Sequence, residues 1–111
     1  MSARDIRLGA NEALFREVNE RVADVAGHFV KIETSPVQFN CECGSADCTA
    51  QIELTLVEYE AVRAEATHFA VTPGHELPEI EQVVERHSTY FVVEKRDPEA
   101  EEVAVETDPR S

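Results

Sequence analysis

The segment between positions 37 and 54 reads Val37-Gln-Phe-Asn-Cys41-Glu-Cys43-Gly-Ser-Ala-Asp-Cys48-Thr-Ala-Gln-Ile-Glu-Leu54. Apolar and polar residues alternate over 37–41 and again over 50–54, which is typical of strands with one buried face. Two strands that flank a turn predict a hairpin, and all three cysteines of the chain then lie at its tip. We therefore expect the fold to be organised around the cysteines.

The cysteines follow a Cys-x-Cys-x-x-x-x-Cys pattern that can bring three thiolates to one ion. Residues two apart on an extended segment share a face, and Gly44 favours the turn that returns the third sulfur. Zinc prefers four nitrogen or sulfur ligands in a tetrahedron. The pattern therefore predicts a Zn²⁺ site with Cys41, Cys43 and Cys48 as three of its ligands.

Histidine is the expected source of the fourth ligand. His75 stands in the turn Thr72-Pro-Gly-His-Glu76, which would project its ring from the end of a strand, so we favour His75. His68, at the start of that strand, is the alternative. The less favoured candidates are His28, His87 and Asp47.

Other uses of the thiols fit less well. A disulfide would leave one cysteine over and would need an oxidising compartment. A nucleophilic cysteine usually stands alone beside a base, and an iron–sulfur cluster usually takes four cysteines.

The first helix is predicted over residues 11–30, with Asn11 as its N-cap. Its apolar residues fall on one face of the helix, and they are Leu14, Phe15, Val18, Val22, Val25 and Phe29. We expect this face to pack in the core, with Arg16 on the opposite, outer face; a homodimer or partner contact through the face is the alternative. If the helix instead began near Arg4, Asn11 would lie inside the apolar stripe.

The remaining elements predict an α+β fold. Thr55 and Glu58 form a capping-box pattern before a short helix over 56–65, and residues 68–72 resemble a strand that ends at a Pro-Gly turn. Apolar runs at 83–84 and 90–93 predict a second hairpin, with a helix over 78–85 as the alternative. We expect one small antiparallel sheet with an N-terminal amphipathic helix and a second short helix, held together by the zinc site.

Composition limits the range of functions. The 111 residues carry 10 Lys and Arg against 23 Asp and Glu, a net charge of −13, which disfavours direct contact with nucleic acid or an acidic membrane. No apolar run is long enough to span a bilayer, and the N-terminus lacks a secretory pattern, so we expect a cytoplasmic protein. We predict one domain over 1–96 and a mobile acidic tail over 97–111, where six acidic residues accompany one arginine.

Several stretches resemble a family of small, uncharacterised actinobacterial proteins. They are Asn11-Glu-Ala-Leu-Phe-Arg-Glu-Val-Asn-Glu-Arg21, the Cys41-Glu-Cys-Gly and Cys48 cluster with Glu53-Leu-Thr-Leu, Pro73-Gly-His-Glu76, Val83-Val-Glu and Val92-Val-Glu-Lys95. The resemblance implies a single folded unit in which the cysteines and the Pro-Gly-His-Glu turn occur together. It implies no activity.

A closed Cys3His site leaves no position for water and would be structural. We therefore expect a non-enzymatic interaction or regulatory module that binds a protein partner. One alternative is an acidic protein that binds a basic partner by occupying its nucleic-acid site. The others are a zinc hydrolase with Glu76 as its base and a redox switch that ejects zinc when its thiolates are oxidised.

Overall fold

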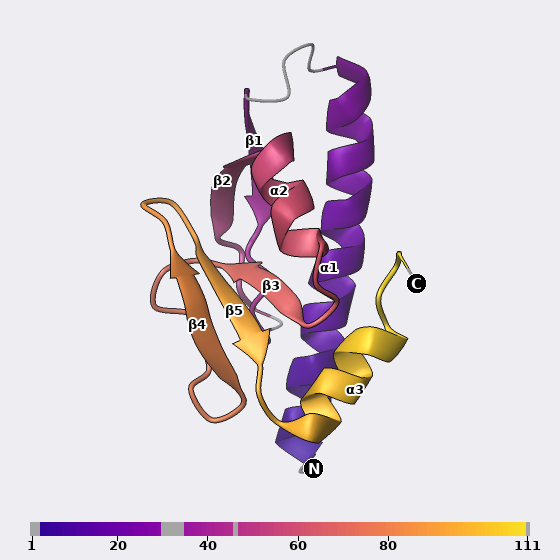
Figure 1. Cartoon of the computed structure of the whole chain (residues 1–111), viewed down its shortest axis with the longest axis vertical. Helices are drawn as coiled ribbons and strands as arrows, with labels where there is room; N and C mark the ends of the chain where they lie inside the picture. The colour runs from indigo at the N-terminus through magenta and orange to yellow at the C-terminus, as the bar shows by residue number, and fades with distance from the viewer. Residues whose placement is uncertain (1–2, 30–34, 46, 111) are drawn as a thin grey trace.

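The computed structural model describes residues 3–29, 35–45 and 47–110. In chain order its elements are α1 (Ala3–Phe29), β1 (Pro36–Asn40), β2 (Gln51–Thr55), α2 (Leu56–Arg63), β3 (His68–Val71), β4 (Glu81–Arg86), β5 (Phe91–Lys95) and α3 (Pro98–Glu106). The predicted α+β class is confirmed, with two small antiparallel sheets in place of one. Figure 1 shows α1 along one side of the molecule, with the strands, α2 and α3 beside it.

The first hairpin forms where the alternating pattern predicts it. β1 and β2 pair antiparallel from Pro36 opposite Thr55 to Asn40 opposite Gln51. The predicted capping box then starts α2, since the Glu58 N–H donates to the Thr55 hydroxyl at 3.1 Å and the Thr55 N–H donates to the Glu58 carboxylate at 2.9 Å. With this capping box, β2 ends at Thr55 and α2 begins at the next residue, Leu56.

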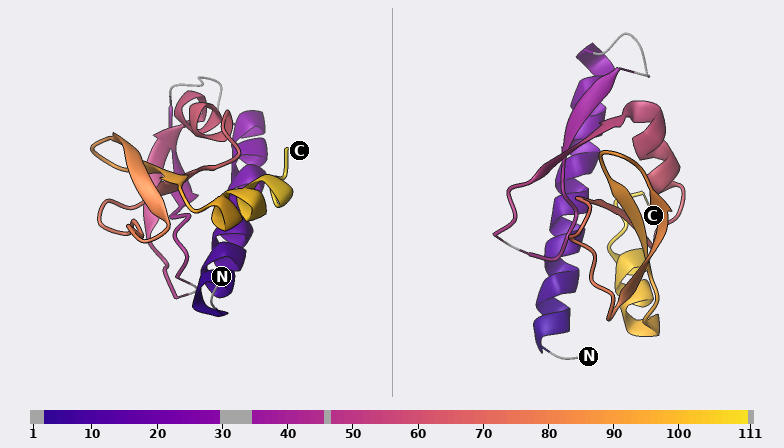
Figure 2. Two further views of the ribbon diagram at one scale, coloured as in Figure 1. Left: turned by 60° about the horizontal axis from the view of Figure 1, so that its bottom comes forward. Right: turned by 90° about the vertical axis from the view of Figure 1, so that its left-hand side faces the viewer.

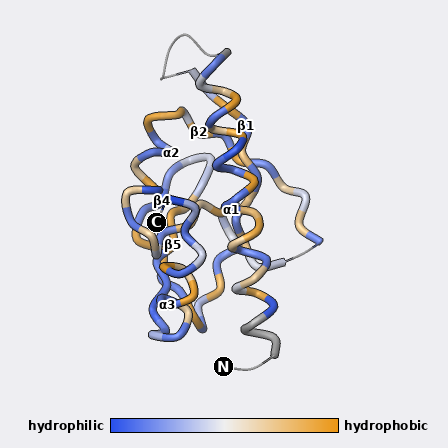
Figure 3. Tube along the Cα trace, turned by 90° about the vertical axis from the view of Figure 1, so that its right-hand side faces the viewer, coloured by the Kyte–Doolittle hydropathy of each residue, from blue (hydrophilic) through white to orange (hydrophobic). Residues whose placement is uncertain are grey.

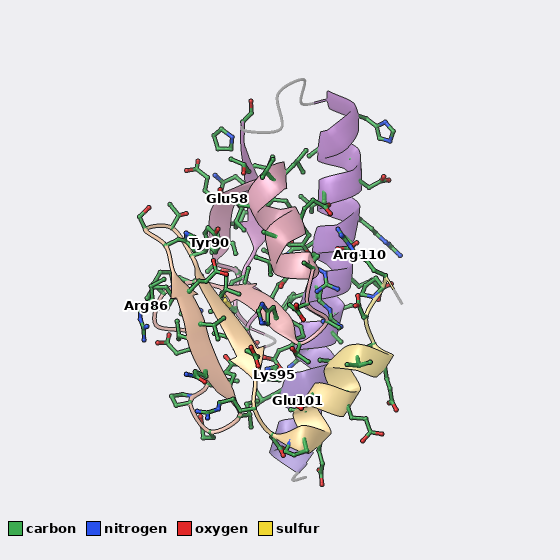
Figure 4. All side chains as sticks on the ribbon, in the orientation of Figure 1. Glu58, Arg86, Tyr90, Lys95, Glu101 and Arg110 are labelled. Atoms are coloured by element: carbon green, nitrogen blue, oxygen red, sulfur yellow. The ribbon has the colours of Figure 1, made fainter. Side chains whose placement is uncertain are left out.

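The second sheet has the strand order β3-β5-β4. The runs at 83–84 and 90–93 form the predicted hairpin β4–β5, and the alternative helix over 78–85 is wrong for the strand residues from Glu81 onward. A register shift between Val83 and Glu85 marks an irregularity in β4. The hydroxyl of Tyr90, the residue before β5, donates to Glu58 of α2 at 3.3 Å and so joins the second sheet to α2 (Figure 4).

Two clusters form the core. The first joins the β1–β2 hairpin to α2 and includes the stacked rings of Phe39 and Tyr59, whose centroids lie 4.4 Å apart. The second joins the cysteine segment to the second sheet and α3, and its buried residues are Cys41, Cys43, Phe69, Val71, Val93 and Ala104. Cys41 and Cys43 are therefore part of the core, and Cys48 packs against it half-buried.

Helix α1 differs from the prediction in both its start and its orientation. It begins at Ala3, so Asn11 lies inside the helix and is not its N-cap. The predicted core stripe is largely exposed: Leu14, Val18 and Val25 keep 56%, 38% and 55% of their surface. Along α1, hydrophobic and hydrophilic segments alternate, as the hydropathy colouring of Figure 3 shows. Val30 and the side chain of Phe29 lie outside the described residues.

The buried face of α1 is instead mostly polar, and its fully buried members are Glu12, Arg16 and Asn19, with Ala23 following. Arg16 donates to the carbonyl oxygens of Ala66 at 2.6 Å and Ala104 at 2.7 Å. Such burial is favourable only when the polar groups find partners, and those partners come from distant parts of the chain. Helical periodicity cannot reveal them.

The prediction of a mobile tail over 97–111 is wrong for most of that segment. Residues Pro98–Glu106 form α3, which packs against α1 and β5. Pro98 suits the first turn of a helix, and Ala104 is buried in the second core cluster. Asp108, beyond α3, pairs with the buried guanidinium of Arg63. Both views of Figure 2 show α3 beside the N-terminal half of α1.

Arg110 completes this attachment by pairing with Glu20 of α1 at 2.9 Å and with Glu60 of α2 at 2.7 Å. Figure 4 shows Arg110 beside these two helices. The acidic segment is ordered because its apolar residues, its single arginine and acidic residues that include Asp108 have partners in the rest of the fold. The proposed boundary at residue 96 therefore does not separate an ordered part from a disordered one.

Candidate metal centre

Backbone hydrogen bonds continue the first hairpin into the cysteine segment. The Cys41 N–H donates to the Ala50 carbonyl at 3.1 Å, and the Cys48 N–H donates to the Ser45 carbonyl at 3.2 Å. The first bond extends the β1–β2 ladder by one step, and the second closes the turn that brings Cys48 back. The hairpin tip is thus held by the main chain.

Gly44 lets this tip pack closely against α1. A Cβ atom added at Gly44 would lie 2.6 Å from Leu8 Cδ2 and 3.0 Å from Leu8 Cβ, so a larger residue would force the tip away from the helix. The Asn11 amide also donates to the Gly44 carbonyl at 2.8 Å. Asn11 therefore binds the cysteine segment through its side chain and does not have the predicted N-cap role.

A tight turn positions His75 on the opposite side of the site. The His75 N–H donates to the Thr72 carbonyl at 2.9 Å, with Pro73 and Gly74 between them and a φ of 94° at Gly74. Proline at the second position and a glycine with positive φ at the third are the signature of a type II turn. Any side chain at Gly74 would be strained, and this turn directs His75 back toward the hairpin tip.

The structure brings together all four residues that the sequence predicts. The sulfur atoms of Cys41, Cys43 and Cys48 and a ring nitrogen of His75 all lie within 4.8 Å of one another. His75 Nδ1 lies 3.6 Å from the sulfurs of both Cys41 and Cys48. Ideal zinc bond lengths at a tetrahedral angle place sulfur and nitrogen about 3.6 Å apart. The donor set therefore fits one small tetrahedral ion.

Hydrogen bonds favour a thiolate at Cys41. The Cys43 thiol and the Thr72 N–H, 3.1 Å from the Cys41 sulfur, lower the pKa of Cys41 to about 4 against the opposing effect of burial. The same sharing of a proton raises the pKa of Cys43 above its usual value. Metal ligation requires thiolates, and a backbone N–H directed at a ligand sulfur is a typical outer-shell contact.

The other histidines have other partners. His68 lies 3.0 Å from the Glu94 carboxylate, and His87 lies 2.9 Å from Glu85. His28 is exposed near the end of α1, and Asp47 is exposed in the hairpin turn. Among the described residues, none of these four belongs to the group that can hold an ion.

Glu42, between two of the cysteines, is a positioning residue that the sequence reasoning missed. It is fully buried, and its carboxylate accepts hydrogen bonds from Asn19 Nδ2 at 2.9 Å, the Tyr59 hydroxyl at 3.0 Å and the Ala70 N–H at 3.0 Å. Burial raises its pKa above the usual value. Because side chains alternate along an extended segment, Glu42 points into the core while its neighbours present sulfur to the site. The Cys-Glu-Cys alternation places Glu42 on the side opposite the two sulfurs, but it does not reveal the three partners.

Replacing Glu42 with alanine should destabilise the protein and weaken metal binding together. The change leaves the Tyr59 hydroxyl and the Ala70 N–H without this acceptor, and the Asn19 amide keeps only its bond to the Asn40 carbonyl at 2.7 Å. We expect a loss of about 3 kcal/mol in the free energy of unfolding, measured with urea. Metal affinity, measured by competition with a chelator, should fall about 10- to 100-fold, as it does on loss of outer-shell partners. Glu42→Gln keeps one acceptor and the side-chain shape, so it should lose much less of both. Equal losses in the two variants would contradict the positioning role.

The fold and the site define a small α+β protein with a Cys3His group arranged to hold a metal ion. In the part of the chain that the structure describes, no helix combines the length and the apolar character needed to cross a membrane. A scan against protein-family models and searches of curated proteins and solved structures each return no match.

Proposed function

We propose that Cys41, Cys43, Cys48 and His75 bind one Zn²⁺ as a structural site, and that the protein is a non-enzymatic interaction module of the reducing cytoplasm. The observation that carries the proposal is the convergence of three sulfurs and one imidazole nitrogen within 4.8 Å. Soft sulfur and nitrogen donors in a tetrahedron favour zinc over magnesium or calcium, which prefer oxygen.

The position of the site supports a structural role. Cys41 and Cys43 are 2% and 4% exposed and pack with residues of the second sheet and α3, and His75 comes from the turn after β3. An ion held by all four would fasten the first hairpin to the second sheet. Four protein ligands leave no coordination position for a reacting water. Glu76, the base of a hydrolytic alternative, is not in the group of four.

The exposed face of α1 supports a role in protein binding. Leu14, Val18 and Val25 lie on the same side of the helix at intervals of roughly one and two turns, and each keeps more than a third of its surface. An apolar row that a folded chain leaves uncovered is typical of a contact surface. We propose that a protein partner, or a second copy of the chain, covers it.

Metal analysis of the purified full chain tests the zinc site. Native mass spectrometry and elemental analysis should give one zinc per chain. Cys43→Ser and His75→Ala should each weaken zinc binding by more than the roughly 100-fold that marks the upper range for outer-shell changes. His68→Ala is the matched control and should leave the affinity unchanged. A stably folded protein without metal, or a loss in the His68 variant equal to that in the His75 variant, would overturn the proposal.

A further inference from the structure

A second candidate site lies on the other side of the second core cluster. A cavity of about 370 Å³ separates the first half of α1 from α3 and the end of β5. Its deep wall includes the buried residues Glu12, Phe69, Lys95 and Ala104, while Ala10 and Thr107 are exposed at its rim. A cavity of about 150 Å³ already accommodates benzene, so this one has room for a longer apolar molecule.

Small residues keep the cavity open. Gly9 and Ala10 of α1 face Ala100 and Ala104 of α3 across it. A Cβ added at Gly9 would make only an ordinary contact, 3.7 Å from Val103 Cγ1. The two helices therefore touch near Gly9 and Val103 without filling the space that they enclose.

Two residues of the deep wall, Glu12 and Lys95, belong to a group of three buried charges that Glu81 completes from behind the wall. The Lys95 ammonium contacts Glu12 and lies 2.5 Å from Glu81 Oε1, and all three side chains are at most 3% exposed. Figure 4 shows Lys95 where β5 approaches α1 and α3. Glu12 Oε1 is buried and has no hydrogen-bond partner among the described residues. Buried polar atoms are nearly always paired, so this oxygen needs either a proton shared with the neighbouring Glu81 carboxylate or a donor from outside the chain.

Charge balance identifies the kind of donor. Two carboxylates and one ammonium leave the group one positive charge short when all three are ionised, and an unpaired charge in an apolar surrounding is costly. We propose that this cavity binds a small molecule with an apolar body and a primary ammonium group, with the ammonium hydrogen-bonded to Glu12 Oε1 and the body between α1 and α3.

The surroundings of Glu12 agree with this assignment. Burial and the neighbouring Glu81 carboxylate raise the pKa of Glu12 to about 8, against the lowering effect of Lys95. The site thus takes up a proton in place of the missing cation. A bound ammonium would replace that proton as the compensating charge.

Titration calorimetry of the full chain as purified, with three six-carbon probes, tests the proposal. Hexylammonium should bind at one saturable site, about tenfold or more tighter than 1-hexanol, because a hydrogen bond to a charged group is stronger than a neutral one. Hexanoate should not bind, since its charge repels the two carboxylates. Ala100→Phe fills the cavity and should abolish binding of hexylammonium.

Glu12→Gln should weaken hexylammonium binding about tenfold or more while leaving 1-hexanol binding nearly unchanged. Glu102→Gln removes the same charge from an exposed position of α3 and is the matched control. Absence of saturable hexylammonium binding, hexanoate binding as tight as hexylammonium, or hexylammonium binding that persists in the folded Ala100→Phe variant would each overturn the proposal. The Ala100→Phe result keeps the test decisive if Glu12→Gln fails to fold.

Discussion

Removal of the bound metal with a chelator should cost the protein about 5 kcal/mol or more in free energy of unfolding, which is comparable with the whole stability of a small domain. Two buried cysteines meet a half-buried cysteine and a half-buried histidine, and hydrogen bonds favour a thiolate at Cys41 that a metal ion would neutralise. The four ligands also join two sheets that share no strand. Loss of the ion therefore removes one connection between the cysteine segment and the second sheet. The bond from the Glu42 N–H to the Ala70 carbonyl at 2.8 Å and the Glu42 side chain remain to join them.

Thermal unfolding followed by circular dichroism, before and after chelation, measures this loss. Addition of one equivalent of zinc should restore the original midpoint, and His68→Ala should respond like the unmodified protein because His68 pairs with Glu94 and not with the cysteines. A midpoint that does not change after complete metal removal would show that the site does not stabilise the fold.

The parts of this structure that the sequence predicts are those set by neighbours in the chain. The alternation of apolar and polar residues predicted the first hairpin, and the Thr55 and Glu58 pair predicted the start of α2. The Pro73-Gly74 turn favoured His75 over His68 as the fourth member of the site. Each depends on residues only a few positions apart. Such short-range signals can be read without knowing what packs against them.

The parts that the sequence mispredicts depend on distant partners. The 3.6-residue period of α1 shows which residues share a face but not which face is covered. Arg16 is buried because carbonyls at Ala66 and Ala104 accept its N–H groups, and neither follows from the local pattern. The burial of Glu42 has the same explanation, because its hydrogen-bond partners come from α1, α2 and β3.

The acidic C-terminal segment gives the sharpest contrast between sequence and structure. Its composition predicts disorder, but a few specific contacts decide the outcome. Ala104 supplies apolar burial, its carbonyl accepts from Arg16, and Asp108 neutralises the buried Arg63. The net charge gives every acidic residue the same weight, so it does not reveal that Asp108 pairs with the buried guanidinium of Arg63.

Deletion of residues 97–111 is accordingly expected to lower the free energy of unfolding by about 5 kcal/mol or more. The deletion removes the Ala104 carbonyl from the buried guanidinium of Arg16, and it removes Asp108 from that of Arg63, which keeps Glu20 at 3.2 Å. Removing one partner of a buried ion pair costs about 3–5 kcal/mol. It also exposes the apolar wall that α3 covers. Urea unfolding of the deletion variant and the full chain measures the difference. A mobile tail would give no difference.

A control on charge alone completes this test. Glu102 and Glu106 are exposed on α3, so the double change to glutamine lowers the acidity of the segment without touching its buried contacts. That variant should stay within about 0.5 kcal/mol of the full chain. Asp108→Ala, in contrast, should reproduce part of the deletion's effect because it removes one of the two carboxylates that pair with Arg63 and leaves Glu20, 3.2 Å from Arg63 Nε. If the deletion is neutral, α3 does not stabilise the fold; if the glutamine variant is as unstable as the deletion, acidity and not packing explains the loss.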